Sequence, residues 1–326
     1  MWENTDKELK SFSNKFHKEN KNTLDEFQNI FNGIENMDGN ASETELNWFK
    51  RRIHNHYEYL SDYGKYKANR YLKMRRIKKR DLFWFDLFMI YAYQQYKALQ
   101  LEMTLFNNVA QDIYKTTRKE LGDIAKKKIN VDDIVNKAIN SPNSKGYIWQ
   151  VYNDTNTEYN VNELYNLCIN RLRQNKPLNV NDKAFKKLFN KQNKRLISIN
   201  GDKISGALDN ETIYIANTVK LECYNEYNIQ KCKFIAVEDK VTTKMCKSLD
   251  GQIFNVHDWN TFKRYSATNE AMVRLRVYGM IPGVNLPPID DHFHYCRSTI
   301  TYILDKDVEE DTRKKLTERA NKNERK

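Results

Sequence analysis

The feature of this sequence that most constrains its fold is a long stripe of apolar residues, repeating at intervals of three and four, between Phe85 and Ile113. This rhythm places side chains on one face of an α-helix, and Gly122, after the basic Arg118 and Lys119, is a typical helix stop. A stripe of this length also suits an intermolecular coiled coil. Aromatic-rich stripes, however, favour burial against helices of the same chain, so we predict a bundle. The stripe comprises Phe85, Phe88, Ala92, Tyr96, Leu99, Met103, Phe106, Ala110 and Ile113.

Further helices are predicted on both sides of this stripe. Ser42 and Glu45 have the spacing of a capping box, and the apolar residues after them recur at helical intervals as far as Leu60. Beyond the stripe, shorter helices are expected at 132–139, 162–173 and 182–193, with breaks around Pro142 and Pro177. The first two-thirds of the chain are therefore predicted to be helical.

The pattern changes near residue 200. A break at 197–206 precedes a helix predicted to begin at Asp209. Strands are predicted at 233–237, from Ile253 onward and at 298–303, with Asp250 and Gly251 as a hairpin-type turn. The predicted fold class is mostly α: a helical region at 1–208, a small α+β module at 209–304 and a charged tail at 305–326.

The charge balance points to polyanionic partners. The 326 residues include 55 Lys and Arg against 43 Asp and Glu, a formal charge of +12, so nucleic acid is the leading candidate partner. The densest basic run is interpreted in two ways that the sequence leaves open: it lies along a phosphate backbone, or it is a solvated helix face. The run comprises Lys73, Arg75, Arg76, Lys78, Lys79 and Arg80.

Cysteine content bears on the cellular compartment of the protein, and hydropathy bears on membrane insertion. The five cysteines form no dense framework and no secretory signal precedes them, so reduced thiols in a cytoplasm are expected. The most apolar stretch, from Leu82 to Tyr93, contains Asp86 and is well short of the roughly 20 residues that a spanning helix needs. No membrane contact is predicted.

A candidate metal site lies in the C-terminal third. Cys246 and Cys296, with His292 and His294, supply enough soft ligands for tetrahedral zinc. The residue three before Cys246 is Thr243, so a Cys-x-x-Cys pair is missing. The favoured alternative makes both cysteines small core residues and lets the histidines hydrogen-bond to loop backbone. No cofactor is therefore expected, with zinc as the minority hypothesis.

The order of motifs in this region resembles a known family. The region carries, in this order, Asp239, Thr242, Cys246, Leu249, Asp250, Gly251, Pro287, Pro288, His294, Cys296, Arg297 and Ser298. This series is similar to the C-terminal domain of phage Mu F-like head morphogenesis proteins, the phage minor head or minor capsid proteins, over about residues 209–303. It departs from the family pattern at Thr243, where many members have a cysteine, and at Phe293, where they have a histidine.

This resemblance implies a virion protein that is present in few copies at the portal vertex or capsid interior and is assembled in the host cytoplasm. The implied partners are the portal protein, other capsid components and packaged double-stranded DNA. The basic run and the long helical part agree with such a role.

An enzymatic role is the alternative. The sequence has no phosphate-binding glycine loop, no Gly-x-Ser-x-Gly elbow and no His-Glu-x-x-His helix, so we predict that the protein is not an enzyme. The competing hypotheses are a thiolate–imidazole pair of Cys246 with His292 or His294, and a packaged nuclease or toxin-like effector. The favoured alternative is that the aspartates cap turns and that Arg297 pairs with a carboxylate. The residues of the nuclease hypothesis are His257, His294, Arg297, Asp239 and Asp250.

Overall fold

The structure is a computed structural model that describes residues 2–34, 37–122, 130–133, 136, 154–193, 206–236, 247, 250–255 and 299–303. The chain divides into two compact units. The helical unit comprises residues 6–105 and 139–205, and the mixed unit comprises 1–5, 106–138 and 206–326. The sequence boundary at residue 208 falls close to the start of a helix at Gly206, while the mixed unit also takes in 106–138.

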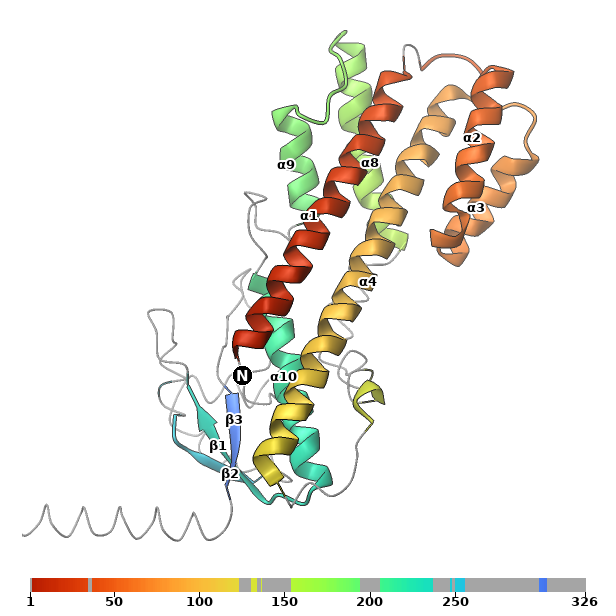
Figure 1. The fold of residues 1–326 in the computed structure, drawn as a ribbon. Helices are drawn as coiled ribbons and strands as arrows, with labels where there is room; N and C mark the ends of the chain where they lie inside the picture. Colours follow the sequence, from red (N-terminus) through yellow and green to blue (C-terminus); the bar gives the residue numbers. More distant parts are fainter. Residues whose placement is uncertain are drawn as a thin grey trace, which may run out of the picture. The chain divides into compact units, whose positions relative to one another are not determined.

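Most described residues are helical, and a small sheet lies in the C-terminal region, which confirms the predicted fold class. Figure 1 shows these elements in sequence colours. No helix among the described residues is long and apolar enough to span a membrane. The helices are α1 (Trp2–Asn32), α2 (Glu43–His56), the short 3-10 helix η1 (Tyr57–Tyr59), α3 (Asp62–Lys73), α4 (Lys79–Leu121), α8 (Asp154–Arg173), α9 (Lys183–Gln192) and α10 (Gly206–Glu226).

The predicted long helix is α4, and it ends where the sequence indicates. Gly122 follows it with φ of +55°, a left-handed conformation that glycine adopts without steric cost. The predicted stripe is buried at both ends of α4, but Tyr96 in its middle is exposed. There the buried side chains are Gln94, Ala98 and Glu102 instead. The prediction of the buried face was therefore wrong in the middle of the helix.

A buried amide cluster explains this shift. Gln94 Nε2 donates hydrogen bonds to Asn20 Oδ1 of α1 at 2.9 Å and to Asn193 Oδ1 beside α9 at 3.0 Å. Only the Nε2 of Gln94 is partnered, because its Oε1 is buried with no hydrogen-bond partner among the described residues. The two bonds made by Nε2 lower the cost of burying this polar side chain where an apolar one is expected. Buried polar residues also interrupt the apolar spacing of α1. Its buried phenylalanines, such as Phe16 and Phe27, are separated by the buried polar Asn20 and Thr23.

Local capping signals match the structure closely. The Ser42 side chain accepts the Glu45 N–H, and the Glu45 carboxylate accepts the Ser42 N–H, so the predicted capping box begins α2. Asp182 caps α9 by accepting the Ala184 N–H at 2.9 Å, and α9 carries Phe185 into the core, edge-on to the phenylalanines of α1. The helix predicted at 162–173 begins earlier, at Asp154. Most of the one predicted at 132–139 lies outside the described residues.

The mixed unit contains an antiparallel sheet in the order β2-β1-β3, formed by β1 (Lys231–Ile235), β2 (Ile253–Asn255) and β3 (Thr299–Ile303). All three predicted strands are present, although β1 begins two residues before the predicted strand at 233–237 and ends at Ile235. The central residue Cys232 pairs with Phe254 on one side and Tyr302 on the other. The Tyr302 hydroxyl donates to the Glu120 backbone O at 2.9 Å, which joins β3 to the end of α4.

The turn at Asp250 and Gly251 leads into β2 and does not join β1 to β2 directly, because residues 236–252 lie between the strands. Gly251 has φ of +75°, and its N–H donates to the Phe234 backbone O at 2.9 Å. Asp250 Oδ1 accepts the Ala236 N–H at 2.8 Å. Asp250, three residues before β2, thus binds the backbone directly after β1.

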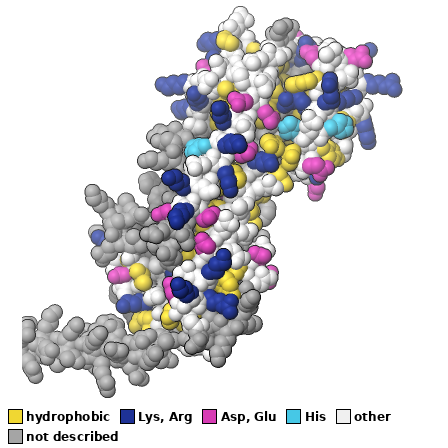
Figure 2. Space-filling view, in the orientation of Figure 1, with side chains coloured by type: hydrophobic (Ala, Val, Ile, Leu, Met, Phe, Trp, Pro, Cys, Tyr) yellow, Lys and Arg dark blue, Asp and Glu magenta, His cyan; other side chains and the backbone are white. Residues whose placement is uncertain are grey.

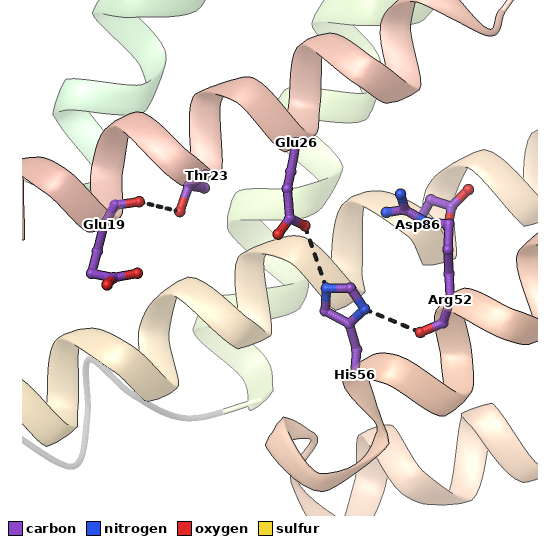
Figure 3. A network of polar contacts seen from close by, with 6 residues as sticks. All are labelled: Glu19, Thr23, Glu26, Arg52, His56 and Asp86. Atoms are coloured by element: carbon purple, nitrogen blue, oxygen red, sulfur yellow. Dashed lines mark hydrogen bonds and ion pairs between the residues drawn. The ribbon is translucent and has the colours of Figure 1, made fainter.

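Lys and Arg side chains project from the surface over α2 and α3 (Figure 2). A charged network joins α1, α2 and α4 (Figure 3). Arg52 Nε of α2 donates to Asp86 Oδ1 of α4 at 2.9 Å, with the Asp86 side chain only 1% exposed. His56 Nδ1 lies 3.1 Å from the Arg52 backbone O, and its Nε2 lies 3.3 Å from Glu26 Oε2 of α1. Loss of hydration raises the pKa of Asp86 to about 6, despite the attraction of Arg52.

The buried pair should show strong coupling between its two members. Asp86→Leu leaves the Arg52 guanidinium with no counterion at a site where it is 13% exposed, and we expect a loss of about 3–5 kcal/mol in the free energy of unfolding. The double variant Arg52→Met/Asp86→Leu should recover most of this loss, because an apolar pair has no charge to desolvate. Urea unfolding of the wild type, both single variants and the double variant measures the coupling. Additive losses would show that the pair does not act as a unit.

The pH dependence follows from the direction of the Asp86 pKa. Because the folded pKa, about 6, lies above the ordinary value of 3.8, the stabilisation from the protonated carboxyl is fully present below pH 3.8. It is lost as the pH rises through about 6. In Asp86→Asn the amide stands in for the protonated acid. The stability of the wild type relative to this variant should therefore fall by roughly 3 kcal/mol over that range. Unfolding curves across about pH 4 to 7 test this, and a constant difference would contradict it.

Candidate nucleic-acid interface

The basic run predicted from the sequence forms the connection between two helices. α3 ends at Lys73, Met74 is its extended C-cap, and α4 begins at Lys79. Ile77 is 3% exposed and anchors the connection, and its backbone O accepts the Ala41 N–H at 2.8 Å. The Lys79 N–H donates to the Gly39 backbone O at 3.1 Å. The run is therefore not a single helix face, but a connection held at defined points.

Two of the six basic residues are held in ion pairs. Lys79 Nζ lies 3.0 Å from Glu45 Oε1, and Arg80 Nη2 lies 2.9 Å from Asp38 Oδ1. The Ser42 backbone N–H, together with Lys79, holds the pKa of Glu45 below its ordinary value. Lys79 is also half-buried. These two cations are partly neutralised before any ligand arrives.

The other four are available. Lys73, Arg75, Arg76 and Lys78 are all exposed, and none has an ion-pair partner among the described residues. Ile77 points into the core between them, so the neighbouring cations are directed outward. Four unpaired cations on a short anchored segment form a surface suited to phosphate groups.

Helix α3 extends this basic surface. Between Asp62 and Arg80 the chain holds nine Lys or Arg residues, and the single acidic residue is Asp62 itself. Tyr66 is 61% exposed, and it shares a face of α3 with Arg70 and Lys73 by helical spacing. Figure 2 shows Lys and Arg side chains over this end of the helical unit. We call α3 and the connection to α4, residues 62–80, the basic surface.

Not every residue of the basic surface is free to bind a ligand. Lys67 pairs with Glu158 of α8 and lies over the Tyr63 ring at 4.6 Å and the Trp84 ring at 4.5 Å. The Tyr63 hydroxyl donates to the same Glu158 carboxylate at 2.6 Å. These contacts fasten α3 to α8 and α4. Lys67 therefore stabilises the surface and is not counted among its binding groups.

Most of the predicted motif residues lie outside the described residues. Only Asp250 and Gly251 are described, so the zinc, thiolate and nuclease hypotheses stay predictions. The others are Asp239, Thr242, Cys246, Leu249, His257, Pro287, Pro288, His292, His294, Cys296, Arg297 and Ser298. The described cysteines, Cys168, Cys223 and Cys232, are buried free thiols, and burial raises the pKa of each to about 12. Their thiolate forms are disfavoured, as expected of core residues.

Sequence reasoning missed one residue beside the motif region. Lys220 of α10 is 4% exposed, and its Nζ donates to Thr299 Oγ1 at 3.1 Å and to the Ile300 backbone O at 3.0 Å. Thr299 Oγ1 in turn donates to Asn217 Oδ1 at 3.0 Å. Burial lowers the pKa of Lys220 to about 8, against the opposing effect of Glu120. Lys220 thus fixes the first residues of β3, directly after Ser298.

Comparison with protein families, with curated proteins and with solved structures finds no match to this chain.

Proposed function

We propose that this chain is a bacteriophage minor head protein of the Mu F-like type, and that it contacts packaged double-stranded DNA through the basic surface. The sequence support is the ordered motif series from Asp239 to Ser298. A mostly helical fold with a small antiparallel sheet agrees with the architecture expected from the resemblance. The observation that carries the DNA contact is a set of four exposed cations with no ion-pair partner in the part of the chain that the structure describes: Lys73, Arg75, Arg76 and Lys78.

The proposed binding is independent of base sequence. Lys and Arg side chains on an anchored connection contact phosphates, which repeat identically along any duplex. Each neutralised phosphate releases condensed counterions, so the logarithm of affinity should fall with the logarithm of salt concentration at a slope of about −0.9 per contact. Four contacts give a slope of about −3.6. Such binding suits a protein that meets packaged DNA of any sequence.

The proposal also accounts for the anchoring of the basic surface. Ile77 in the core and the backbone hydrogen bonds to residues 39–41 hold the connection before a ligand arrives. A preorganised site loses less conformational entropy on binding than a flexible tail does. The ion pair of Arg80 with Asp38 is exposed on both sides and can exchange its carboxylate for a phosphate at small cost.

Neutralising the free cations should weaken DNA binding equally for all sequences. The variant Arg75→Gln/Arg76→Gln/Lys78→Gln removes three proposed phosphate contacts, so the salt slope should become less steep by about 2.7. Fluorescence anisotropy with duplexes of unrelated sequence, measured over a series of salt concentrations, gives both the affinity and the slope. Residues 75–78 lie between helices, so far-UV circular dichroism should stay unchanged.

The matched control neutralises three exposed lysines of α9 in the same unit, Lys183, Lys186 and Lys187, each to Gln. This control has the same net charge as the test variant. Equal weakening by the two variants would show that net charge, not the basic surface, determines binding. Salt-independent binding by the wild type would overturn the proposal of DNA contact.

The head protein role predicts association with assembling particles. Co-expressed with its own portal protein and major capsid protein, the chain should sediment with procapsids. Purified alone, it should leave plasmid DNA and RNA intact in the presence of Mg²⁺ or Zn²⁺. Cleavage that is abolished by His294→Ala would favour the effector hypothesis instead. Failure to sediment with procapsids would contradict the head protein role even if DNA binding were confirmed.

A further inference from the structure

A cavity of about 330 Å³ opens in the helical unit where the end of α1 meets the beginnings of α2 and α4. Its volume lies within the range of sites that hold drug-sized ligands or several side chains. The apolar lining includes Ile30, Ile34, Leu82 and Phe83, and Trp48, 42% exposed, also lines it. None of the four free cations of the basic surface lines it.

The charged groups within the cavity are already compensated, with one exception. Glu45 is paired with Lys79 at 3.0 Å, and Asp86 is paired with Arg52 at 2.9 Å. A ligand charge placed deep in the cavity would lose its hydration without gaining an uncommitted partner. The interior therefore favours an apolar group.

The exception is Arg51. It lines the cavity, is exposed, and has no ion-pair partner among the described residues. The guanidinium matches a carboxylate in geometry as well as in charge. The lining thus combines apolar side chains with one exposed cation that has no ion-pair partner among the described residues.

We propose that this cavity is a docking site for an acidic amphipathic segment of a partner protein. The segment inserts a bulky apolar side chain between α1, α2 and α4, and it places a carboxylate of the same segment against Arg51. A helical segment meets both requirements, because residues three or four apart lie on one face. This inference does not depend on DNA binding, since it uses none of Lys73, Arg75, Arg76 and Lys78.

The structure offers a matched pair of variants at one position. Gly33 lines the cavity, and a Cβ added there would meet the Ile30 backbone O at 3.6 Å and the Asn29 backbone O at 3.9 Å, which are ordinary contacts. Its φ is not in the left-handed region, so a side chain is tolerated. Gly33→Trp should occupy the cavity, whereas Gly33→Ala should leave most of it open.

The experiment selects short peptides from a random display library against the full-length protein, with counter-selection against Gly33→Trp. Enriched peptides should share a bulky apolar residue with Asp or Glu one helical turn away. The best of these peptides, synthesised with a fluorophore, should bind Gly33→Ala as it binds the wild type. It should bind Gly33→Trp at least about tenfold more weakly.

A charge exchange tests the second contact. Arg51→Glu should weaken the selected peptide about tenfold, and the peptide with its acidic residue changed to Lys should regain affinity for Arg51→Glu alone. Lys176→Glu, the same charge change at an exposed position outside the cavity, is the control. Three results would each overturn the proposal: no enrichment, enriched peptides that bind Gly33→Trp equally well, or enriched peptides that carry Lys or Arg beside the apolar residue. Circular dichroism and urea unfolding of each variant separate these results from misfolding.

Discussion

The helical unit depends on satisfying polar side chains on the buried face of α4. Asp86 and Gln94 both point into the bundle, and each is partnered from other helices. A buried amide or carboxylate without a partner would cost several kcal/mol, so these contacts restrict which helices can pack against α4 and in which register. The apolar core around them supplies most of the burial. The polar contacts make one arrangement preferable to others of similar hydrophobic area.

The polar contacts between helices also determine which charged side chains remain available at the surface. Arg52 reaches inward to Asp86, while the neighbouring Arg51 remains exposed at the cavity. Glu45 serves both as the capping carboxylate of α2 and as the partner of Lys79 at the start of α4. The beginnings of α2 and α4 are thereby fixed to each other. The connection between α3 and α4 is held in a defined position as a result. Cations in this position are directed outward because Ile77 is held in the core.

Local sequence signals predicted where helices begin and end. They did not predict which polar residues are buried, because the partners of those residues lie far away in the sequence. The capping box at Ser42, the cap at Asp182 and the stop at Gly122 act within one helical turn, so the sequence contains the whole interaction. The partners of Gln94 lie 74 and 99 residues away, and those of Lys220 lie about 80 residues away. A pattern of apolar spacing treats such residues as solvent-facing. For this reason apolar spacing misplaces the centre of the buried face in the middle of α4, and it does not indicate the burial of Lys220.

In the basic surface, too, the sequence does not reveal which side chains have distant partners. The sequence identified all six cations but gave them equal weight, because the partners of Lys79 and Arg80 lie 34 and 42 positions earlier in the chain. The structure separates the four free cations from the two paired ones. Lys79 belongs to the basic surface and also lines the cavity, yet its ammonium is committed to Glu45. The proposed DNA contact and the proposed peptide contact therefore draw on different side chains. Neutralising residues 75, 76 and 78 leaves the cavity lining intact, and filling the cavity at Gly33 leaves the four free cations intact.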